Sequence, residues 1–125
     1  MRVLDAGVVV ELLIGGLDPA RLGSEDLGAP HLIDSEVTHV LRGITMRGAI
    51  TEAQAARAMQ GFIALTIERF PADCLRPRMW ELRHNFSGYD ATYIALTETL
   101  SATALLTTDA RLAAAPGARC TIEVL

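Results

Sequence analysis

The stretch 104-ALLTTDARL-112 begins with apolar residues and then changes abruptly to Thr107, Thr108 and Asp109. A short apolar run closed by polar residues predicts a buried strand that ends at this point. The start of the chain repeats the pattern, since the apolar residues Val3 and Leu4 run directly into Asp5. In open α/β sheets the ligand crevice lies outside the carboxyl ends of the strands. Both aspartates are therefore predicted to lie at such an edge.

Outward from this stretch, apolar strands alternate with helical patterns along the whole chain. We expect strands at residues 2–4, 29–32, 66–70, 104–107 and 121–125. Helices are expected at residues 8–14, 19–27, 33–48, 51–65, 77–84, 90–100 and 110–115, with Thr51 and Gln54 forming a capping box. This order predicts one α/β domain over residues 1–125, with a short, mostly parallel sheet and helices on both faces.

The composition is that of a compact domain that does not contact a membrane. Of the 125 residues, 50% are hydrophobic, which is enough for one domain with a real core. No apolar run approaches the roughly 18 residues of a membrane helix. Asp5 and Glu11 interrupt the segment that a secretory signal would need to be apolar. We therefore expect a cytoplasmic protein.

The charged residues narrow the possible functions. The net charge is −4, and all 11 basic residues are arginine. The absence of lysine counts against phosphate-loop NTPases, receiver domains and most aspartate phosphatases, which need a lysine at the site. An acidic balance also argues against nonspecific duplex binding through a basic surface. Cys74 and Cys120 are predicted to be reduced and mostly buried, and the three histidines lack zinc-like spacing.

Three aspartates have a plain structural explanation beside a functional one. Asp5, Asp90 and Asp109 each precede or open an expected helix. Aspartate is a favoured N-cap and stabilises a helix by roughly 0.5–2 kcal/mol. Capping alone would therefore account for any one of them.

Glu36 does not fit this explanation. Glutamate is not a favoured cap, and Asp34 or Ser35 can serve instead. Glu36 lies at the flank of the apolar face of its expected helix, with no arginine three or four residues away. A half-covered carboxylate is costly unless it is paired or coordinated. If these acids share one crevice, a divalent cation is the simplest partner, and all-oxygen ligands select Mg²⁺ or Mn²⁺.

Four sequence blocks that carry these acids resemble a known family. They are 3-VLDAGVVVELL-13, 31-HLIDSEVTHVLR-42, 89-YDATYIALTETL-100 and 105-LLTTDARLAAAPG-117. In order and spacing they resemble the PIN-domain ribonucleases, and within them the VapC toxins of bacterial type II toxin–antitoxin pairs. The blocks are spread over the whole chain, and the last two are the most specific.

The resemblance implies an acidic quartet made of Asp5, Glu36, Asp90 and Asp109. Asp5 and Asp90 would be the principal magnesium ligands, and the other two would complete the pocket. Thr107 matches a family hydroxyl that hydrogen-bonds the ligands from outside the metal shell. Many relatives carry serine or threonine where this chain has Gly7, which predicts one lost supporting contact and a lower metal affinity.

The resemblance also implies an activity and partners. It implies a magnesium-dependent endoribonuclease toxin, with manganese as a possible substitute, which cleaves RNA, forms a homodimer and is inhibited by a cognate VapB-type antitoxin. An antitoxin arginine is expected to enter the acidic pocket. Apolar residues of the antitoxin are expected to cover Val9, Leu12 and Leu13, unless these are core residues.

Two alternatives remain open at this stage. One is a catalytically silent PIN-like module that only binds RNA or a partner. The other is an aspartate-nucleophile phosphatase, which would need a second aspartate where Gly7 stands. Met79 and Trp80 fit core or protein-contact positions better than base-stacking ones, and Arg83 and His84 fit a solvated helix end. Arg111 fits either a phosphate contact or a surface charge.

Overall fold

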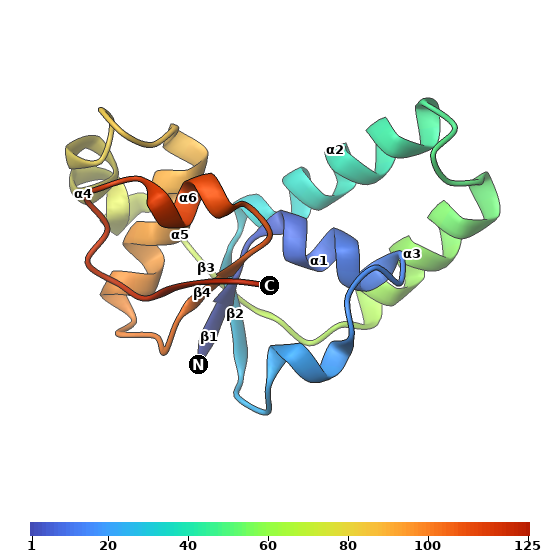
Figure 1. Cartoon of the computed structure of the whole chain (residues 1–125), viewed down its shortest axis with the longest axis horizontal. Coiled ribbons are helices and arrows are strands. Elements are labelled where there is room, and N and C mark those ends of the chain that lie inside the picture. The colour runs from blue at the N-terminus through green and yellow to red at the C-terminus, as the bar shows by residue number, and fades with distance from the viewer.

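Five parallel strands form one sheet at the centre of the protein (Figure 1). The computed structural model describes residues 1–125. Its strands are β1 (Arg2–Leu4), β2 (Leu27–Pro30), β3 (Glu68–Phe70), β4 (Leu105–Thr107) and β5 (Ile122–Val124), in the order β3-β2-β1-β4-β5. All neighbouring strands pair in parallel. The expected α/β domain is confirmed, with a sheet that is entirely rather than mostly parallel.

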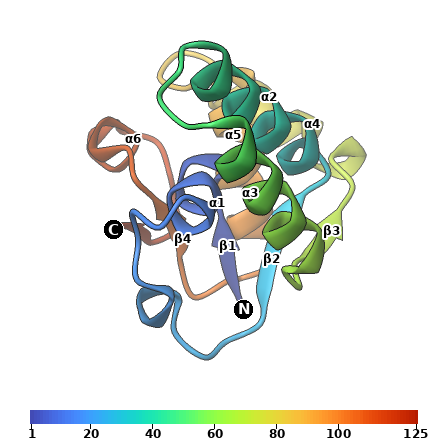
Figure 2. The same cartoon turned by 90° about the vertical axis from the view of Figure 1, so that its right-hand side faces the viewer.

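Helices cover both faces of this sheet. They are α1 (Ala6–Leu13), α2 (Leu32–Met46), α3 (Glu52–Ala64), α4 (Arg76–Glu81), α5 (Gly88–Thr99) and α6 (Ala110–Ala114). Helices α1, α2 and α3 lie on one side and α4, α5 and α6 on the other, as the two views show (Figures 1 and 2). None of the helices combines the length and the apolar character needed to cross a membrane.

The sheet divides the core into two apolar clusters. Val3 and Leu105 contribute to the cluster under α4, α5 and α6, whereas Leu4 and Leu106 contribute to the cluster under α1, α2 and α3. All four side chains are fully buried. Because successive residues of a strand point to opposite faces, an uninterrupted apolar strand can serve both clusters. This explains why the strands have no polar alternation.

The sequence-based boundaries need two corrections around β2. The helix expected at residues 19–27 is only a 3₁₀ turn over Pro19–Leu22, because Gly23 in the left-handed region (φ 78°) ends it. Leu27 belongs to β2, and Leu32, expected in that strand, is the first residue of α2. The cysteines are both free, but Cys74 is exposed rather than buried.

The capping box predicted for α3 is confirmed. The Thr51 N–H donates to Oε1 of Gln54 at 2.8 Å, and the Gln54 N–H donates to Oγ1 of Thr51 at 3.1 Å. These reciprocal bonds satisfy two backbone donors that a helix start otherwise leaves without partners. The start of this helix was therefore readable from the sequence.

The chain changes direction across the sheet at β1. β2 pairs with one edge of β1 and β4 with the other, so the chain leaves the centre of the sheet in opposite directions. Such a switch point opens a crevice at the carboxyl ends of the strands. Asp5 follows β1, and Asp109 follows β4 after one intervening residue. The fold therefore places both aspartates at the crevice.

Candidate functional site

Thr107 connects the two strand-end aspartates. It is fully buried at the end of β4. Its hydroxyl donates a hydrogen bond to Oδ2 of Asp5 and accepts one from the Asp109 backbone N–H at 3.0 Å. The register that pairs Leu4 with Leu106 brings the following residues, Asp5 and Thr107, side by side. The expected contact between this threonine and the acidic group is therefore present.

Two of the three aspartates do cap helices. Oδ1 of Asp5 accepts a hydrogen bond from the Val8 N–H at 2.8 Å at the start of α1. Oδ1 of Asp109 accepts one from the Arg111 N–H at 2.9 Å at the start of α6. Capping and a role at the site are compatible here, because each carboxylate has a second oxygen that the cap does not use.

Asp90 is different, and the capping explanation is wrong for it. Helix α5 starts at Gly88, and its cap is Ser87, whose side chain accepts a hydrogen bond from the Asp90 N–H at 3.1 Å. Asp90 therefore lies in the first turn of the helix, and its carboxylate has no capping role. Its position next to the other acids needs a different explanation.

Glu36 has a partner that sequence reasoning missed. The hydroxyl of Tyr93 on α5 donates to Oε1 of Glu36 at 2.8 Å. Burial raises the pKa of Tyr93 far above its usual range, so the phenol keeps its proton and acts as a donor. Tyr93 follows Asp90 by three residues, which places both on one face of α5. That spacing was the available signal.

The caps expected beside Glu36 are also wrong. Helix α2 begins one turn earlier than Ser35, with His31 at the cap position and no capping side chain. Asp34 instead forms an ion pair with Arg69 of β3, with Nη2 and Oδ1 2.8 Å apart. Glu36 takes no part in capping α2, and its hydrogen-bond partner is Tyr93.

The four acids act on one another electrostatically. Burial raises the pKa of Asp5, with the charges of Asp90 and Asp109 adding to the effect and the hydrogen bonds from Thr107 and Val8 opposing it. Burial also raises the pKa of Glu36, and the charges of Asp90 and Asp5 add to this.

The pKa of Asp90 is raised in the same way, whereas the pKa of Asp109 is lowered. Burial raises the pKa of Asp90, and the charge of Asp109 raises it further. The backbone hydrogen bond from Arg111 lowers the pKa of Asp109, which lies nearest to solvent. The charges of Asp90 and Asp109 thus reach Asp5, and those of Asp5 and Asp90 reach Glu36, so the four predicted residues influence one another near the carboxyl ends of the strands.

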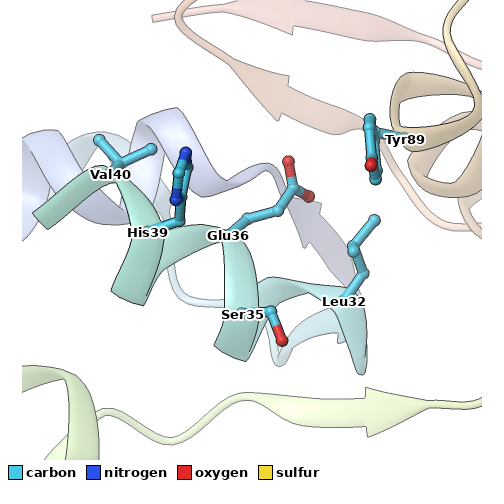
Figure 3. A pocket seen from close by; sticks show the side chains of 6 residues that line it. All are labelled: Leu32, Ser35, Glu36, His39, Val40 and Tyr89. Atoms are coloured by element: carbon cyan, nitrogen blue, oxygen red, sulfur yellow. The ribbon is translucent and has the colours of Figure 1, made fainter. Parts of the chain in front are cut away.

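Glu36 also lines a cavity of about 500 Å³ between α2 and α5. Figure 3 shows its carboxylate pointing toward the gap that Tyr89 faces from the other side. Leu32, His39 and Val40 complete much of the wall. The cavity thus has a mixed wall of apolar and polar residues, in which Glu36 supplies the carboxylate.

Gly7 is explained by its neighbour Thr108. A Cβ atom at position 7 would lie 2.7 Å from Oγ1 of Thr108 and 3.4 Å from Oδ1 of Asp5. The space that a serine or threonine side chain would fill is therefore partly taken by the Thr108 hydroxyl group. The chain lacks a hydroxyl at position 7, as expected, but the Thr108 hydroxyl lies close to the place where that group would be.

The donor chemistry of the crevice fits a hard divalent cation. All four side chains offer carboxylate oxygens, and neighbouring carboxylates raise the pKa values of Asp5, Glu36 and Asp90. A cation would relieve this repulsion. As the side chains stand, no group of three or more histidine, cysteine, aspartate or glutamate residues is placed to hold a metal ion. Metal ligation by these residues stays a prediction.

Comparison with known proteins identifies the family. The chain is 39% identical over 126 residues to the ribonuclease VapC9 of Mycobacterium tuberculosis, covering 100% of this chain and 98% of that protein. It is 41% identical over 132 residues to the ribonuclease VapC1 of the same species, covering 98% and 96%. The chain belongs to the VapC ribonuclease family. No protein-family model matches the sequence.

Solved structures agree with the VapC assignment at the level of the fold. A VapC20 toxin from M. tuberculosis, described as cleaving the sarcin–ricin loop, superposes with a TM-score of 0.65 at 16% identity, over 91% of this chain and 94% of that one. PAE2754 from Pyrobaculum aerophilum superposes with a TM-score of 0.68 at 23% identity, over 90% and 77%. The expected PIN fold of a VapC toxin is thereby confirmed.

The structure decides between alternatives for two groups of apolar residues in this VapC chain. Val9 is fully buried and cannot contact an antitoxin, whereas Leu12 and Leu13 pack against the same core cluster and are only partly exposed. Trp80 was expected in the core or at a protein contact, and its 68% exposure excludes only the core position. Trp80 lies on α4, which has only six residues. That is too short for a periodicity of apolar residues to show which face is buried.

Proposed function

We propose that this VapC-family chain is a magnesium-dependent endoribonuclease. The observation that carries the proposal is that Thr107 joins Asp5 to Asp109 at the switch point of the sheet, while the charges of Asp5 and Asp90 raise the pKa of Glu36. The relatives at 39% and 41% identity, which the chain matches over nearly their full length, are named ribonucleases. Together these observations favour a hydrolase over a silent binding module.

Each acid has a role that its surroundings suit. Asp5 is held by two hydrogen bonds from the protein, which fix its carboxylate for ligation. Asp90 and Asp109 offer carboxylates from the starts of α5 and α6 and complete the ligand set. When bound, Mg²⁺ supplies the positive charge that attracts a phosphodiester and stabilises its transition state.

Glu36 is the best-placed proton acceptor. Its pKa is raised by burial and by neighbouring carboxylates, which makes it a stronger base near neutral pH. Tyr93 donates to Oε1, and Oε2 accepts no hydrogen bond from the protein. Tyr93 thereby orients the carboxylate while leaving one oxygen to take a proton from attacking water.

The proposed metal dependence can be measured without any RNA. Calorimetric titration of Mg²⁺ or Mn²⁺ into the purified chain is expected to show binding that Asp90→Asn weakens sharply. Asp90→Asn is the informative variant because it disturbs no helix cap. Equal heats for the variant and the original chain would contradict the four-carboxylate site.

The proposed inhibitor is a VapB-type antitoxin that places an arginine among the four carboxylates. A guanidinium can pair with a carboxylate through two parallel hydrogen bonds, so it is suited to this crevice. Expression of the chain alone is expected to stop growth, and co-expression with the small neighbouring gene is expected to restore it. Growth that is equal in both cases would contradict the toxin role. We also propose a homodimer, which sedimentation of the purified chain would test.

A further inference from the structure

The exposed face of α4 carries an aromatic ring that the nuclease site does not use. Trp80 is the single tryptophan of the chain, and it is 68% exposed. The guanidinium of Arg83 lies over this ring, 4.5 Å from the centroid, and donates a hydrogen bond to the Trp80 carbonyl at 2.8 Å. A large aromatic side chain held in the open by a cation is a surface suited to binding.

Two arginines of this face have no carboxylate partner. Arg76 and Arg83 line a cavity of about 460 Å³ with Met79 and Trp80. Their only side-chain hydrogen bonds to the protein go to the backbone carbonyls of Asp73 and Trp80. Arg78 on the same helix shows the contrast, because its guanidinium pairs with Glu98 at 2.7 Å and with Glu81 at 3.1 Å. Arg76 and Arg83 therefore keep free donors for an external anion.

This cavity, which we call the α4 pocket, adjoins the acidic crevice. Ser87 and Gly88 are among the residues that line it. These residues start α5, and Asp90 lies in the same turn, hydrogen-bonded to Ser87 through its backbone. A chain passing over this turn would go from the carboxylates to the two unpaired guanidinium groups. The chain as a whole carries a net charge of −4, so the positive charge of Arg76 and Arg83 is opposite in sign to that of the protein overall.

We infer that the α4 pocket binds the single-stranded RNA substrate beside the scissile phosphate. A base would stack on Trp80, and Arg76 and Arg83 would hold the adjacent phosphates. Single-stranded nucleic acid is generally bound by this pairing of an aromatic platform with a positive groove. The inference rests on the proposed nuclease function and names how its substrate is held. It also supplies the phosphate contacts that the acidic overall charge lacks.

The unique tryptophan permits a direct test. The protein is titrated in EDTA with a short single-stranded RNA of mixed sequence, and Trp80 emission is followed. We expect saturable quenching. Arg83→Gln and Arg76→Gln are expected to weaken binding several-fold and to lower the salt dependence by about one ion each. Binding of labelled RNA, followed by anisotropy, is expected to fall about tenfold in Trp80→Ala.

Arg57→Gln is the matched control. Arg57 is exposed and forms no ion pair, but it lies on α3, across the sheet from α4. The variant is expected to bind RNA as the original chain does. Absence of quenching, or equal weakening by Arg57→Gln, would overturn the inference. Quenching by the antitoxin but not by RNA would overturn it as well, because the pocket would then be a protein-binding surface.

The nuclease function fails in a different way. If Trp80→Ala binds and cleaves RNA normally while Asp90→Asn does not cleave, the α4 pocket is contradicted and the nuclease function stands. If RNA quenches Trp80 but no variant or condition gives cleavage, the pocket is supported and the nuclease function is contradicted.

Discussion

The hydroxyl of Thr107 donates a hydrogen bond to the carboxylate of Asp5, which lies 102 residues away in the sequence. The same oxygen accepts a hydrogen bond from the backbone of Asp109. One buried threonine thus fixes the ends of the two central strands and orients two of the four acids. The position of the site depends on the pairing of β1 with β4.

Removing that hydroxyl is expected to weaken both the fold and metal binding. Thr107→Val keeps the shape but leaves Asp5 without its donor, which is expected to cost about 1–3 kcal/mol in the free energy of unfolding. Loss of a residue that orients a ligand is expected to lower Mg²⁺ affinity roughly 10–100-fold. Thr107→Ser keeps the hydroxyl and serves as the control. Calorimetry that shows equal affinities for the valine and serine variants would refute the bridging role.

Tyr93→Phe tests the orientation of Glu36. The change removes the hydrogen bond to Oε1 and keeps the ring, so the free energy of unfolding is expected to fall by only about 1 kcal/mol. The pKa of Glu36 is expected to rise, because the bond from Tyr93 lowers it in the native protein. In cleavage assays, the acidic limb of the pH–rate profile should therefore move to higher pH. An unmoved limb would remove Glu36 as the proton acceptor.

The raised pKa of Asp90 has a definite consequence for stability without metal. Burial raises this pKa, the Ser87 side chain opposes the shift, and the charge of Asp109 adds to it. A carboxyl with a raised pKa in the folded state stabilises the protein most below its unfolded value of about 4. That stability is lost as the pH rises through the raised value. In EDTA, Tm is therefore expected to fall more steeply as the pH rises above about 4 for the original chain than for Asp90→Asn.

Adding Mg²⁺ at neutral pH is expected to reverse this difference. Ligand binding to the folded state raises Tm, and only the chain with all four carboxylates is expected to bind the ion well. Parallel pH curves for the two proteins in EDTA, together with equal responses to Mg²⁺, would show that Asp90 is an ordinary surface carboxylate.

Gly7 and Thr108 are expected to be energetically coupled. Alanine in place of a helical glycine usually gains roughly 0.5–1 kcal/mol. Here the new Cβ would lie 2.7 Å from Oγ1 of Thr108, and such overpacking typically costs about 1–3 kcal/mol. Gly7→Ala is therefore expected to be neutral or destabilising alone, and stabilising in a Thr108→Ala background. Additive effects in denaturant unfolding would show that the two positions do not interact.

The elements that the sequence pattern predicted well are those with local signals. Thr51 and Gln54 predicted the start of α3, and the apolar runs before Asp5 and Asp109 predicted the strands β1 and β4. These signals depend only on residues close in the chain, so they can be read without the tertiary structure. The family resemblance then brought the four acids together.

The features that were missed depend on tertiary contacts. The partner of Asp34 is Arg69, which lies 35 residues away, so no local rule could reveal that Asp34 is not a cap. The hydrogen bond from Tyr93 to Glu36 spans 57 residues. Exposure of Trp80 depends on how a six-residue helix packs on α5, and a single turn and a half carries too little periodicity to show it.

Cleavage of total cellular RNA, with the cut ends mapped, tests the central claim most directly. The purified chain and Asp90→Asn are each incubated with RNA in Mg²⁺ or in EDTA. The four-carboxylate account predicts discrete new ends with the original chain in Mg²⁺, and no such ends in EDTA or with Asp90→Asn. The same ends appearing with Asp90→Asn, or in EDTA, would contradict a magnesium-dependent nuclease built on these acids.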